Sequence, residues 1–249
     1  MGKRPNKKEV LFIVEGTSDA TTLEQAIGQL YDAIDPEIHI DFLTMRDDDG
    51  DYGGDITSKK GVKPENIERL VNEIILKPFL ISSGLMPKDI IRVIQIVDID
   101  GAFVSDEMVH FSDKAVKAVY HPDSIETDKV ENFLLRNERK SANLRKLSAL
   151  EQIKVQSKTV PYSVFFFSSN LDHFLYGDAN ADDREKGNNA RDFSYFNNTG
   201  ELLLKTIRDI ESHTIDMDYQ QSWAFIMEGN NSLKRHTNLH VLLENLINR

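Results

Sequence analysis

The chain has 249 residues, no cysteine and a formal net charge of −11. The lack of cysteine excludes disulfides and thiolate metal sites, and the acidic balance argues against a protein that coats nucleic acid through bulk electrostatics. No apolar run approaches the roughly 20 residues of a membrane span, and the basic N-terminus lacks the apolar segment of a signal peptide. We therefore expect a cytoplasmic protein that makes no contact with a membrane.

The first predicted strand is the short apolar run Val10–Val14, which ends at Glu15. Gly16 allows the tight turn that follows, because glycine adopts backbone conformations that other residues avoid. The helical spacing of apolar residues then predicts an amphipathic helix over Asp19–Ala33. Asp19 would lie in its first turn, where a negative charge is favourable.

A second strand, Ile38–Met45, leads into a polar segment at 46–61. Asp47, Asp49 and Asp51 match the opening of a calcium-binding loop, but the rest of that signature is absent. A flexible acidic loop near the sheet edge is the favoured interpretation, and a lid facing a substrate is the alternative. A helix is expected from Pro64, with interruptions at Pro78 and at 82–84.

The strongest strand prediction is Ile90–Gly101, in which six of the first eight residues are Ile or Val. This composition is typical of a strand buried on both faces of a parallel sheet. Asp98 and Asp100 are two residues apart, so their side chains can point the same way. If the strand lies beside Val10–Val14, Glu15 and both aspartates converge at one edge and form an oxygen-rich site for Mg²⁺ or Mn²⁺. The simpler alternative is a pair of solvated aspartates in a turn.

Two motifs carry a resemblance to a known family: Val14-Glu15-Gly16 followed by Asp19, and Asp98-Ile99-Asp100-Gly101. Together they resemble the Toprim domain, and in particular the small stand-alone nucleases of phage defence, of the RloB-like and OLD-like kinds. The resemblance covers about the first two thirds of the chain. It implies a Toprim-like fold, a general acid/base or metal-binding role for Glu15, and Mg²⁺ binding by Asp98 and Asp100.

The middle of the chain is rich in charge. Asp123 with Glu126 predicts the start of a helix that runs to about Asn137, and 136–154 is predicted to be charged and helical. This is the densest basic region, with Arg136, Arg139, Lys140, Arg145, Lys146 and Lys154. It could be a solvated helix face or a surface for nucleic acid. We expect no basic partner for the three acids at the sheet edge.

Val160–Ser169 is a further predicted strand, and it places Asp172 and His173 near the same sheet edge. Asp172 could complete the acidic site or merely cap a helix. The polar segment 177–198 is predicted to be a loop, in which Lys186 and Arg191 are spaced to lie near a substrate phosphate. Apolar spacing predicts C-terminal helices that either cover the sheet or form the face of a homo-oligomer.

The sequence thus predicts an α/β fold with a mostly parallel sheet of about four strands, helices on both faces and a helical C-terminal extension. Residues 1–177 would form a Toprim-like catalytic domain, and 178–249 a polar loop and helical extension packed on it. The predicted function is a Mg²⁺-dependent nuclease that cleaves RNA, such as tRNA, or DNA. Its metal ligands would be Glu15, Asp19, Asp98 and Asp100, with Asp172 as a further catalytic acid.

The resemblance also implies a toxic effector controlled by a separate ABC-type ATPase, because the chain has no phosphate-binding G-x-x-x-x-G-K-[ST] motif of its own. The terminal stripe Leu239, Leu242, Leu243, Leu246 and Ile247 could dock that partner or simply pack on the sheet. The alternative function is a non-catalytic Toprim interaction module that binds the ATPase without cleaving anything.

Overall fold

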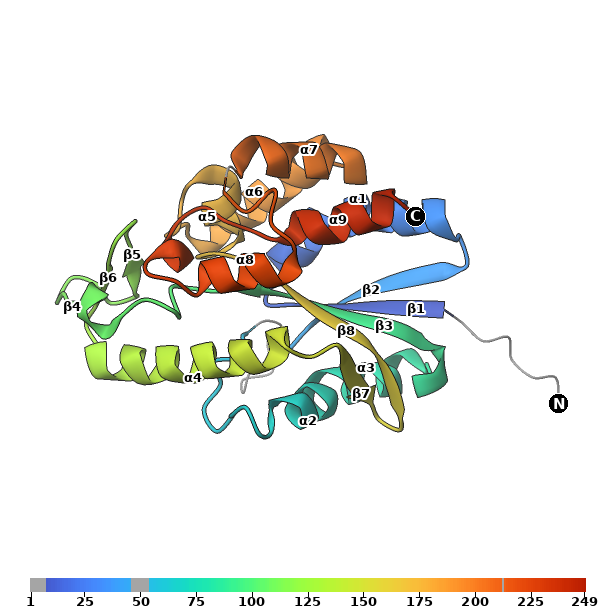
Figure 1. Ribbon diagram of the computed structural model, residues 1–249, viewed down its shortest axis with the longest axis horizontal. Coiled ribbons are helices and arrows are strands. Elements are labelled where there is room, and N and C mark those ends of the chain that lie inside the picture. Colours follow the sequence, from blue (N-terminus) through green and yellow to red (C-terminus); the bar gives the residue numbers. More distant parts are fainter. Residues whose placement is uncertain (1–7, 46–53, 212) are drawn as a thin grey trace.

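A central sheet lies between two layers of helices in the computed structural model, which describes residues 8–45, 54–211 and 213–249 (Figure 1). The calcium-loop aspartates Asp47, Asp49 and Asp51 lie outside these residues. Among the described residues, no helix combines the length and the apolar character needed to cross a bilayer. The α/β class expected from the sequence is confirmed.

The main sheet has the strand order β2-β1-β3-β8-β7. Its strands are β1 (Lys8–Val14), β2 (Ile38–Thr44), β3 (Ile90–Asp98), β7 (Gln152–Val155) and β8 (Lys158–Phe167). All neighbours are parallel except β7 and β8, which pair as an antiparallel hairpin. The hairpin makes β7 a fifth strand, where we expected about four and a helix reaching Lys154.

The sheet is buried on both faces, as the β-branched composition of its central strands predicts. Along β1, Leu11 and Ile13 contribute to one core, whereas Val10, Phe12 and Val14 contribute to the other. The same alternation occurs in β8, where Val164 and Phe166 face the first core and Phe165 and Phe167 face the second. This double burial fixes the register of the central strands and therefore the position of the side chains at their ends.

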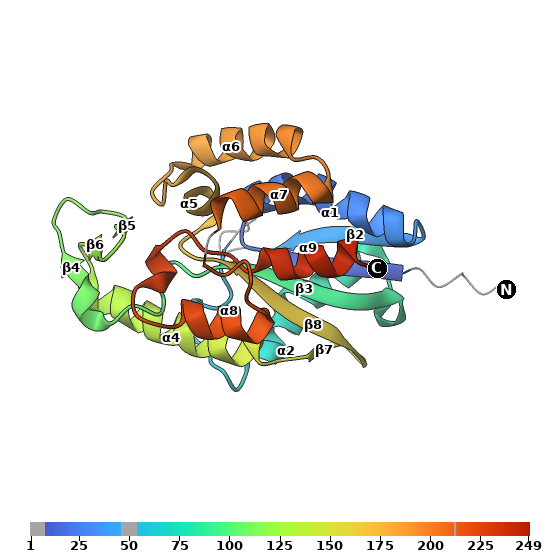
Figure 2. The ribbon, with the colours of Figure 1, turned by 45° about the horizontal axis from the view of Figure 1, so that its top comes forward.

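Helices cover both faces (Figure 2). One side carries α1 (Thr17–Ile34), α5 (Leu171–Tyr176), α6 (Asp183–Phe196), α7 (Gly200–Ile210) and α9 (Leu239–Ile247). The other side carries α2 (Ile67–Val71), α3 (Lys77–Ser83) and α4 (Val130–Ser148), while α8 (Tyr219–Ile226) packs Trp223 and Ile226 into the core of that side. A small second sheet has the order β4-β6-β5, formed by β4 (Val109–Phe111), β5 (Val119–Tyr120) and β6 (Ile125–Thr127).

Three local predictions were wrong. The helix predicted from Asp123 begins only at Val130, because 125–127 pair as a strand of the small sheet. The segment 177–198 is largely α6, which begins after a side-chain cap by Asp182. The helix from Ile67 is not broken at Pro78, because a π-helical turn at Asn72–Leu76 precedes the proline and α3 continues to Ser83; the predicted break at 82–84 is confirmed. Proline has no backbone N–H to donate within a helix, and the π-helical turn before it lets the chain stay helical without that hydrogen bond.

The terminal stripe packs on the sheet. Leu239, Leu242, Leu243 and Leu246 are buried in the same core as Phe12 and Phe165, and Ile247 alone of the stripe is partly exposed. The interpretation of this stripe as a docking face for a partner protein is therefore wrong, because its apolar surface is already covered within the chain.

Candidate metal centre

Two acids meet at the carboxyl edge of the sheet, as the sequence predicted. Glu15 follows β1 and Asp98 ends β3, and these strands are parallel neighbours. The backbone N–H of Asp98 donates to Oε1 of Glu15 at 3.0 Å, which fixes the glutamate against the end of β3. Asp19 is held nearby, because its Oδ2 accepts the backbone N–H of Gly16 at 2.8 Å in the first turn of α1.

The chain turns sharply after β3. Asp100 has a φ of 49°, a left-handed conformation that is uncommon for a residue other than glycine. Gly101 follows at a φ of 65°, and a Cβ atom there would come within 2.7 Å of Ile125. The backbone N–H of Asp100 donates to the carbonyl of Ser169 at 2.9 Å, which ties this turn to the end of β8. Strained backbone of this kind persists only where surrounding contacts hold it, and it is common at functional sites.

The expectation that the acids have no basic partner was wrong. Nζ of Lys140 lies 2.6 Å from Oδ2 of Asp100, and the guanidinium of Arg136 contacts the same oxygen at 2.6 Å. Both cations come from α4, the basic region that we expected to be a solvated helix face or a surface for nucleic acid. Their spacing of four residues places them on the same face of the helix.

Lys140 is the centre of a buried ion network. Its side chain has 0% exposed surface, and its Nζ also lies 2.9 Å from Oδ2 of Asp55 and 3.6 Å from Oε1 of Glu15. Burial alone would raise the pKa of Asp55 and Asp100. Lys140, helped by Thr57 at Asp55 and by Arg136 at Asp100, outweighs burial, so the pKa of both carboxyl groups is lowered. We call Asp55 and Asp100 the lysine-paired acids. Asp55 was not among the predicted site residues, because it belongs to the polar segment that we expected to be a flexible loop.

Glu15, Asp19 and Asp98 behave in the opposite way. Burial raises the pKa of Asp98 well above its ordinary value, and the negative charges of Asp19 and Glu15 raise it further. Burial and the neighbouring Asp55 raise the pKa of Glu15 in spite of Lys140, and burial raises the pKa of Asp19 to about 6. We call these three the raised-pKa acids. Within the described part of the chain, neither Asp98 nor Asp19 forms an ion pair.

These acids line a cavity of about 710 Å³, whereas the fully buried Lys140 lies behind them. Asp172 reaches the same cavity from the first turn of α5, where Asn170, not Asp172, caps the helix. The side-chain amide of Asn189 donates to Oδ1 of Asp172 at 3.0 Å. The structure therefore brings together Glu15, Asp19, Asp98, Asp100 and Asp172, all of which the sequence singled out.

The two predicted phosphate-binding residues separate. Lys186 on α6 lines the cavity, but Arg191 is exposed outside its lining, and its guanidinium donates to the side chain of Asn188. Five residues apart on a helix, the two side chains point in different directions. Lys117, from the segment between β4 and β5, also lines the cavity; no sequence pattern distinguishes it from other surface lysines.

The donor set fits a hard divalent cation. Mg²⁺ and Mn²⁺ prefer carboxylate oxygens, and the cavity presents several of them without a histidine or sulfur ligand among the lining residues. One oxygen each of Glu15, Asp55 and Asp100 lies within 4.8 Å of the other two, but Lys140 already contacts all three residues. Asp98 and Asp19 have no such cation beside them among the described residues, so these two acids, together with the adjacent Glu15, are the better candidates for metal ligands.

No family model, curated protein or solved structure matches this chain.

Proposed function

We propose that this protein is a Mg²⁺-dependent nuclease of the Toprim type, which cleaves phosphodiester bonds in RNA or DNA. The observation that carries the proposal is the contact of Glu15 with Asp98 at the edge of an acid-lined cavity. Both carboxyl groups have a raised pKa because burial and neighbouring acids disfavour their charge. Such a site is costly unless a cation enters it, and clustered acids with perturbed pKa values are typical of functional sites.

Asp98, Asp19 and Glu15 would hold the metal, with Asp100 on the same wall of the cavity. When bound, Mg²⁺ would neutralise charge on the scissile phosphate and lower the pKa of a water molecule. Glu15 is suited to hold or move a proton, because its carboxyl group has a pKa above the ordinary range and contacts Asp98 directly.

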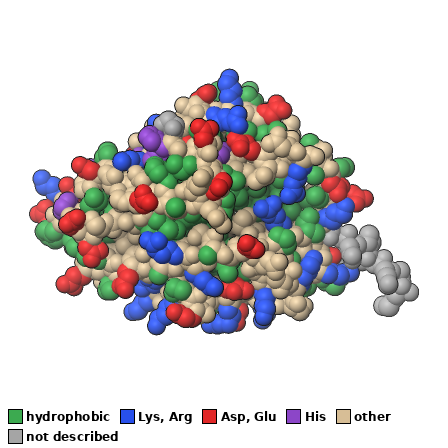
Figure 3. Space-filling view, in the orientation of Figure 1, with side chains coloured by type: hydrophobic (Ala, Val, Ile, Leu, Met, Phe, Trp, Pro, Cys, Tyr) green, Lys and Arg blue, Asp and Glu red, His purple; other side chains and the backbone are tan. Residues whose placement is uncertain are grey.

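Lys140 and Arg136 would act as positioning residues. They fix the carboxylate of Asp100, and Lys140 also contacts Glu15, so the acids keep their places before a metal arrives. Lys186 and Lys117 line the cavity and would contact substrate phosphates there. Substrate attraction would be local, because acidic and basic side chains are interspersed over the face in Figure 3 and the net charge is −11.

The biological role in this proposal is a toxic effector that a separate ABC-type ATPase restrains. Its support is the resemblance of the two motifs at Glu15 and Asp98–Gly101, together with the absence of a phosphate-binding loop from the chain. Growth arrest on expression of the protein alone, relieved by Glu15→Gln, would support this role. No arrest and no change in any RNA or DNA pool would contradict it.

A second candidate function is an interaction module that cleaves nothing. The observation in its favour is Lys140, whose ammonium group contacts three acids and could serve in place of a metal. In that case the acid cluster would be a structural ion network. This candidate predicts that the protein neither binds Mg²⁺ in the cavity nor hydrolyses any nucleic acid.

The experiment that separates the two candidates is incubation of the purified protein with total tRNA, and separately with plasmid DNA, in Mg²⁺, Mn²⁺ or EDTA. Cleavage that requires the metal and is lost in Glu15→Gln supports the nuclease. The matched control is Glu228→Gln, because Glu228 lies far along the chain in a turn after α8 and does not line the cavity. Cleavage that survives in Glu15→Gln, or no cleavage of either polymer, would contradict the nuclease.

A further inference from the structure

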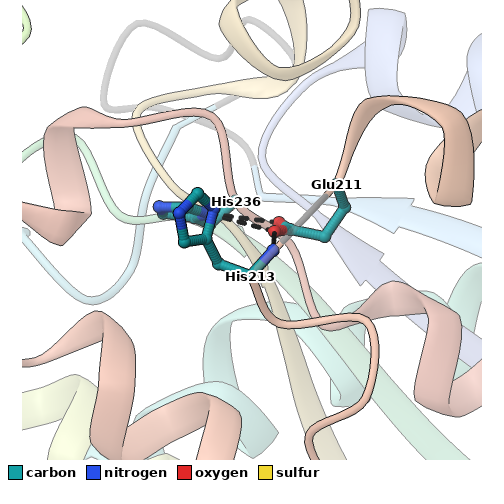
Figure 4. A group of neighbouring side chains, drawn as sticks. All are labelled: Glu211, His213 and His236. Atoms are coloured by element: carbon teal, nitrogen blue, oxygen red, sulfur yellow. Dashed lines mark hydrogen bonds and ion pairs between the residues drawn. The ribbon is translucent and has the colours of Figure 1, made fainter.

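A second group of metal-binding side chains lies apart from the acid-lined cavity. Glu211 caps the C-terminal end of α7, His213 follows it, and His236 comes from the segment between the turn Asn231–Leu233 and α9 (Figure 4). One ligand atom of each residue lies within 4.8 Å of the other two. Glu211 and His236 are buried, at 2% and 3% exposed, whereas His213 is exposed and opens the group to solvent.

Glu211 is held in the manner of a metal ligand. Its Oε1 accepts the backbone N–H groups of His213 at 2.7 Å and Thr214 at 3.0 Å, and its Oε2 accepts that of Thr237 at 3.1 Å. These three backbone hydrogen bonds fix the orientation of the carboxylate, as hydrogen bonds around a metal ligand do.

The imidazole of His236 faces Glu211 through its Nδ1 atom, which is the nitrogen placed to bind a metal ion beside the carboxylate. Its Nδ1 lies 3.2 Å from both oxygens of Glu211, and its buried Nε2 has no hydrogen-bond partner. This distance is at the long end of the usual hydrogen-bond range, and a metal ion bound between the two groups would replace the hydrogen bond. The distance is close to the separation of about 3.3 Å between two ligands of a tetrahedral zinc ion. The second ring is adjacent, since the centroids of His213 and His236 are 5.1 Å apart.

We propose that Glu211, His213 and His236 bind a borderline transition-metal ion, with Zn²⁺ as the reference case. Two imidazoles and one carboxylate suit Zn²⁺, Ni²⁺, Co²⁺ or Cu²⁺, whereas Mg²⁺ favours sites made of oxygen atoms alone. Three protein ligands leave a fourth position for water on the side of the exposed His213. This site does not depend on the proposed nuclease activity, and its chemistry differs from that of the acid-lined cavity.

A metal here would brace the C-terminal segment against the sheet. The carbonyl of His236 accepts the backbone N–H of Ser168 at 2.9 Å, and Oγ1 of Thr237 donates to the carbonyl of Phe166 at 2.6 Å. Arg235 also donates to the carbonyl of Phe174 on α5 at 2.8 Å. The ion would therefore join the end of α7 to the segment that holds β8 and α5, the elements beside Asp172.

The test uses the full-length protein after treatment with a chelator. We expect Zn²⁺ to raise the unfolding temperature while Mg²⁺ leaves this site unaffected, and Co²⁺ to give the intense visible absorption of four-coordinate cobalt. His213→Ala should weaken Zn²⁺ binding by at least about tenfold and abolish the cobalt spectrum. Its matched control is His110→Ala, because His110 is an exposed histidine on β4. His213→Ala should still fold, because the side chain of His213 is exposed.

Repeating the titrations in Asp98→Asn distinguishes this site from the acid-lined cavity. If zinc binds at Glu211, His213 and His236, the Asp98→Asn protein should retain the zinc response. No zinc response in the wild-type protein would overturn the proposal, and so would an equal response in His213→Ala. Either result would leave Glu211 and His236 as a metal-free, hydrogen-bonded pair that holds the C-terminal segment in place.

Discussion

The lysine-paired acids and the raised-pKa acids lie side by side, yet their electrostatic surroundings are opposite. Asp55 and Asp100 contact Lys140 at 2.9 and 2.6 Å, and their pKa values are lowered. Asp98 and Asp19 lack an ion pair among the described residues, and their pKa values are raised by burial first and by neighbouring charge second. Glu15 joins the two groups, because it contacts both Lys140 and the backbone of Asp98.

The difference separates two kinds of carboxylate within one cluster. The lysine-paired acids are neutralised by cations of α4. Arg136 and Lys140 both pair with Asp100 and hold its carboxylate in place. The raised-pKa acids line the cavity, and their negative charge would be offset either by a proton or by a bound cation. Under the proposed function, substitutions of the lysine-paired acids should mainly change stability, and substitutions of the raised-pKa acids should mainly change cleavage.

Lys140→Met should have the largest effect on stability. It removes the cation shared by Asp55, Asp100 and Glu15, and leaves buried carboxylates without a partner. Breaking a buried ion pair costs about 3–5 kcal/mol in the free energy of unfolding, which denaturant titration can measure. Lys146→Met is the control, because Lys146 is exposed on the same helix and should change stability by less than about 0.5 kcal/mol. Equal effects of the two substitutions would show that the ion network is unimportant.

Asp98→Asn and Glu15→Gln should reduce cleavage by about 100-fold or more, the range that general acid–base groups contribute. Neither should lower the stability of the metal-free protein, since each removes a carboxyl group whose charge is disfavoured by burial and by its neighbours. Cleavage assays and thermal melts on the same preparations test both statements. If Asp98→Asn cleaves as fast as the wild-type protein, Asp98 is not a metal ligand.

Asp100→Asn should differ from Asp98→Asn in stability. The like-charge argument from sequence predicted that it would leave the fold equally or more stable, but Asp100 is paired with Lys140 and Arg136. We now expect a loss on the order of 3 kcal/mol in the free energy of unfolding. A melt in which Asp100→Asn is as stable as Asp98→Asn would remove the distinction between the two groups of acids.

The pH dependence of stability should also distinguish the groups. A carboxyl group with a raised pKa binds its proton more tightly in the folded protein, so its favourable contribution is lost as pH rises. For Asp19 this loss falls between its ordinary value of 3.8 and about 6. The lysine-paired acids contribute in the opposite sense, losing stability as pH falls below their ordinary range. The metal-free protein should therefore lose less stability between pH 4 and about 6 in Asp19→Asn than in wild type, as measured by chemical denaturation.

The smallest effect is expected for Asp172→Asn, which should lower cleavage by about tenfold, the lower end of the range for residues that support a metal site. Asp172 lines the cavity but already accepts a hydrogen bond from Asn189, so an amide can partly replace it. Asp178→Asn is the control, because Asp178 follows the C-terminal end of α5 and does not line the cavity. Equal rates for both variants would remove Asp172 from the site.

Much of the fold and of the acid cluster could be predicted from sequence, because strand burial and strand ends leave a local pattern. The β-branched run before Asp98 and the apolar run before Glu15 identify parallel strands, and parallel strands bring their carboxyl ends together. The alternation of buried residues on β1 and β8 follows from the same periodicity.

The cations behind the acids were harder to predict, because their partners are distant in the sequence. Lys140 lies in line with the buried Leu144 and Leu147, so a lysine within an apolar stripe was the available signal for burial. Asp55 gave no such signal, because its position depends on contacts with Lys140 and Thr57 and not on a repeating pattern. The helix at 183–196 was missed because its polar composition outweighed the cap at Asp182.

The central claim is that the raised-pKa acids bind a divalent metal, and Mn²⁺ titration followed by electron paramagnetic resonance tests it most directly. We predict that wild-type protein binds Mn²⁺ at a site from which Mg²⁺ displaces it. Asp98→Asn should lose this site, while the Asp178→Asn control keeps it. Absence of Mg²⁺-sensitive binding in the wild-type protein, or equal binding in Asp98→Asn, would contradict the metal centre.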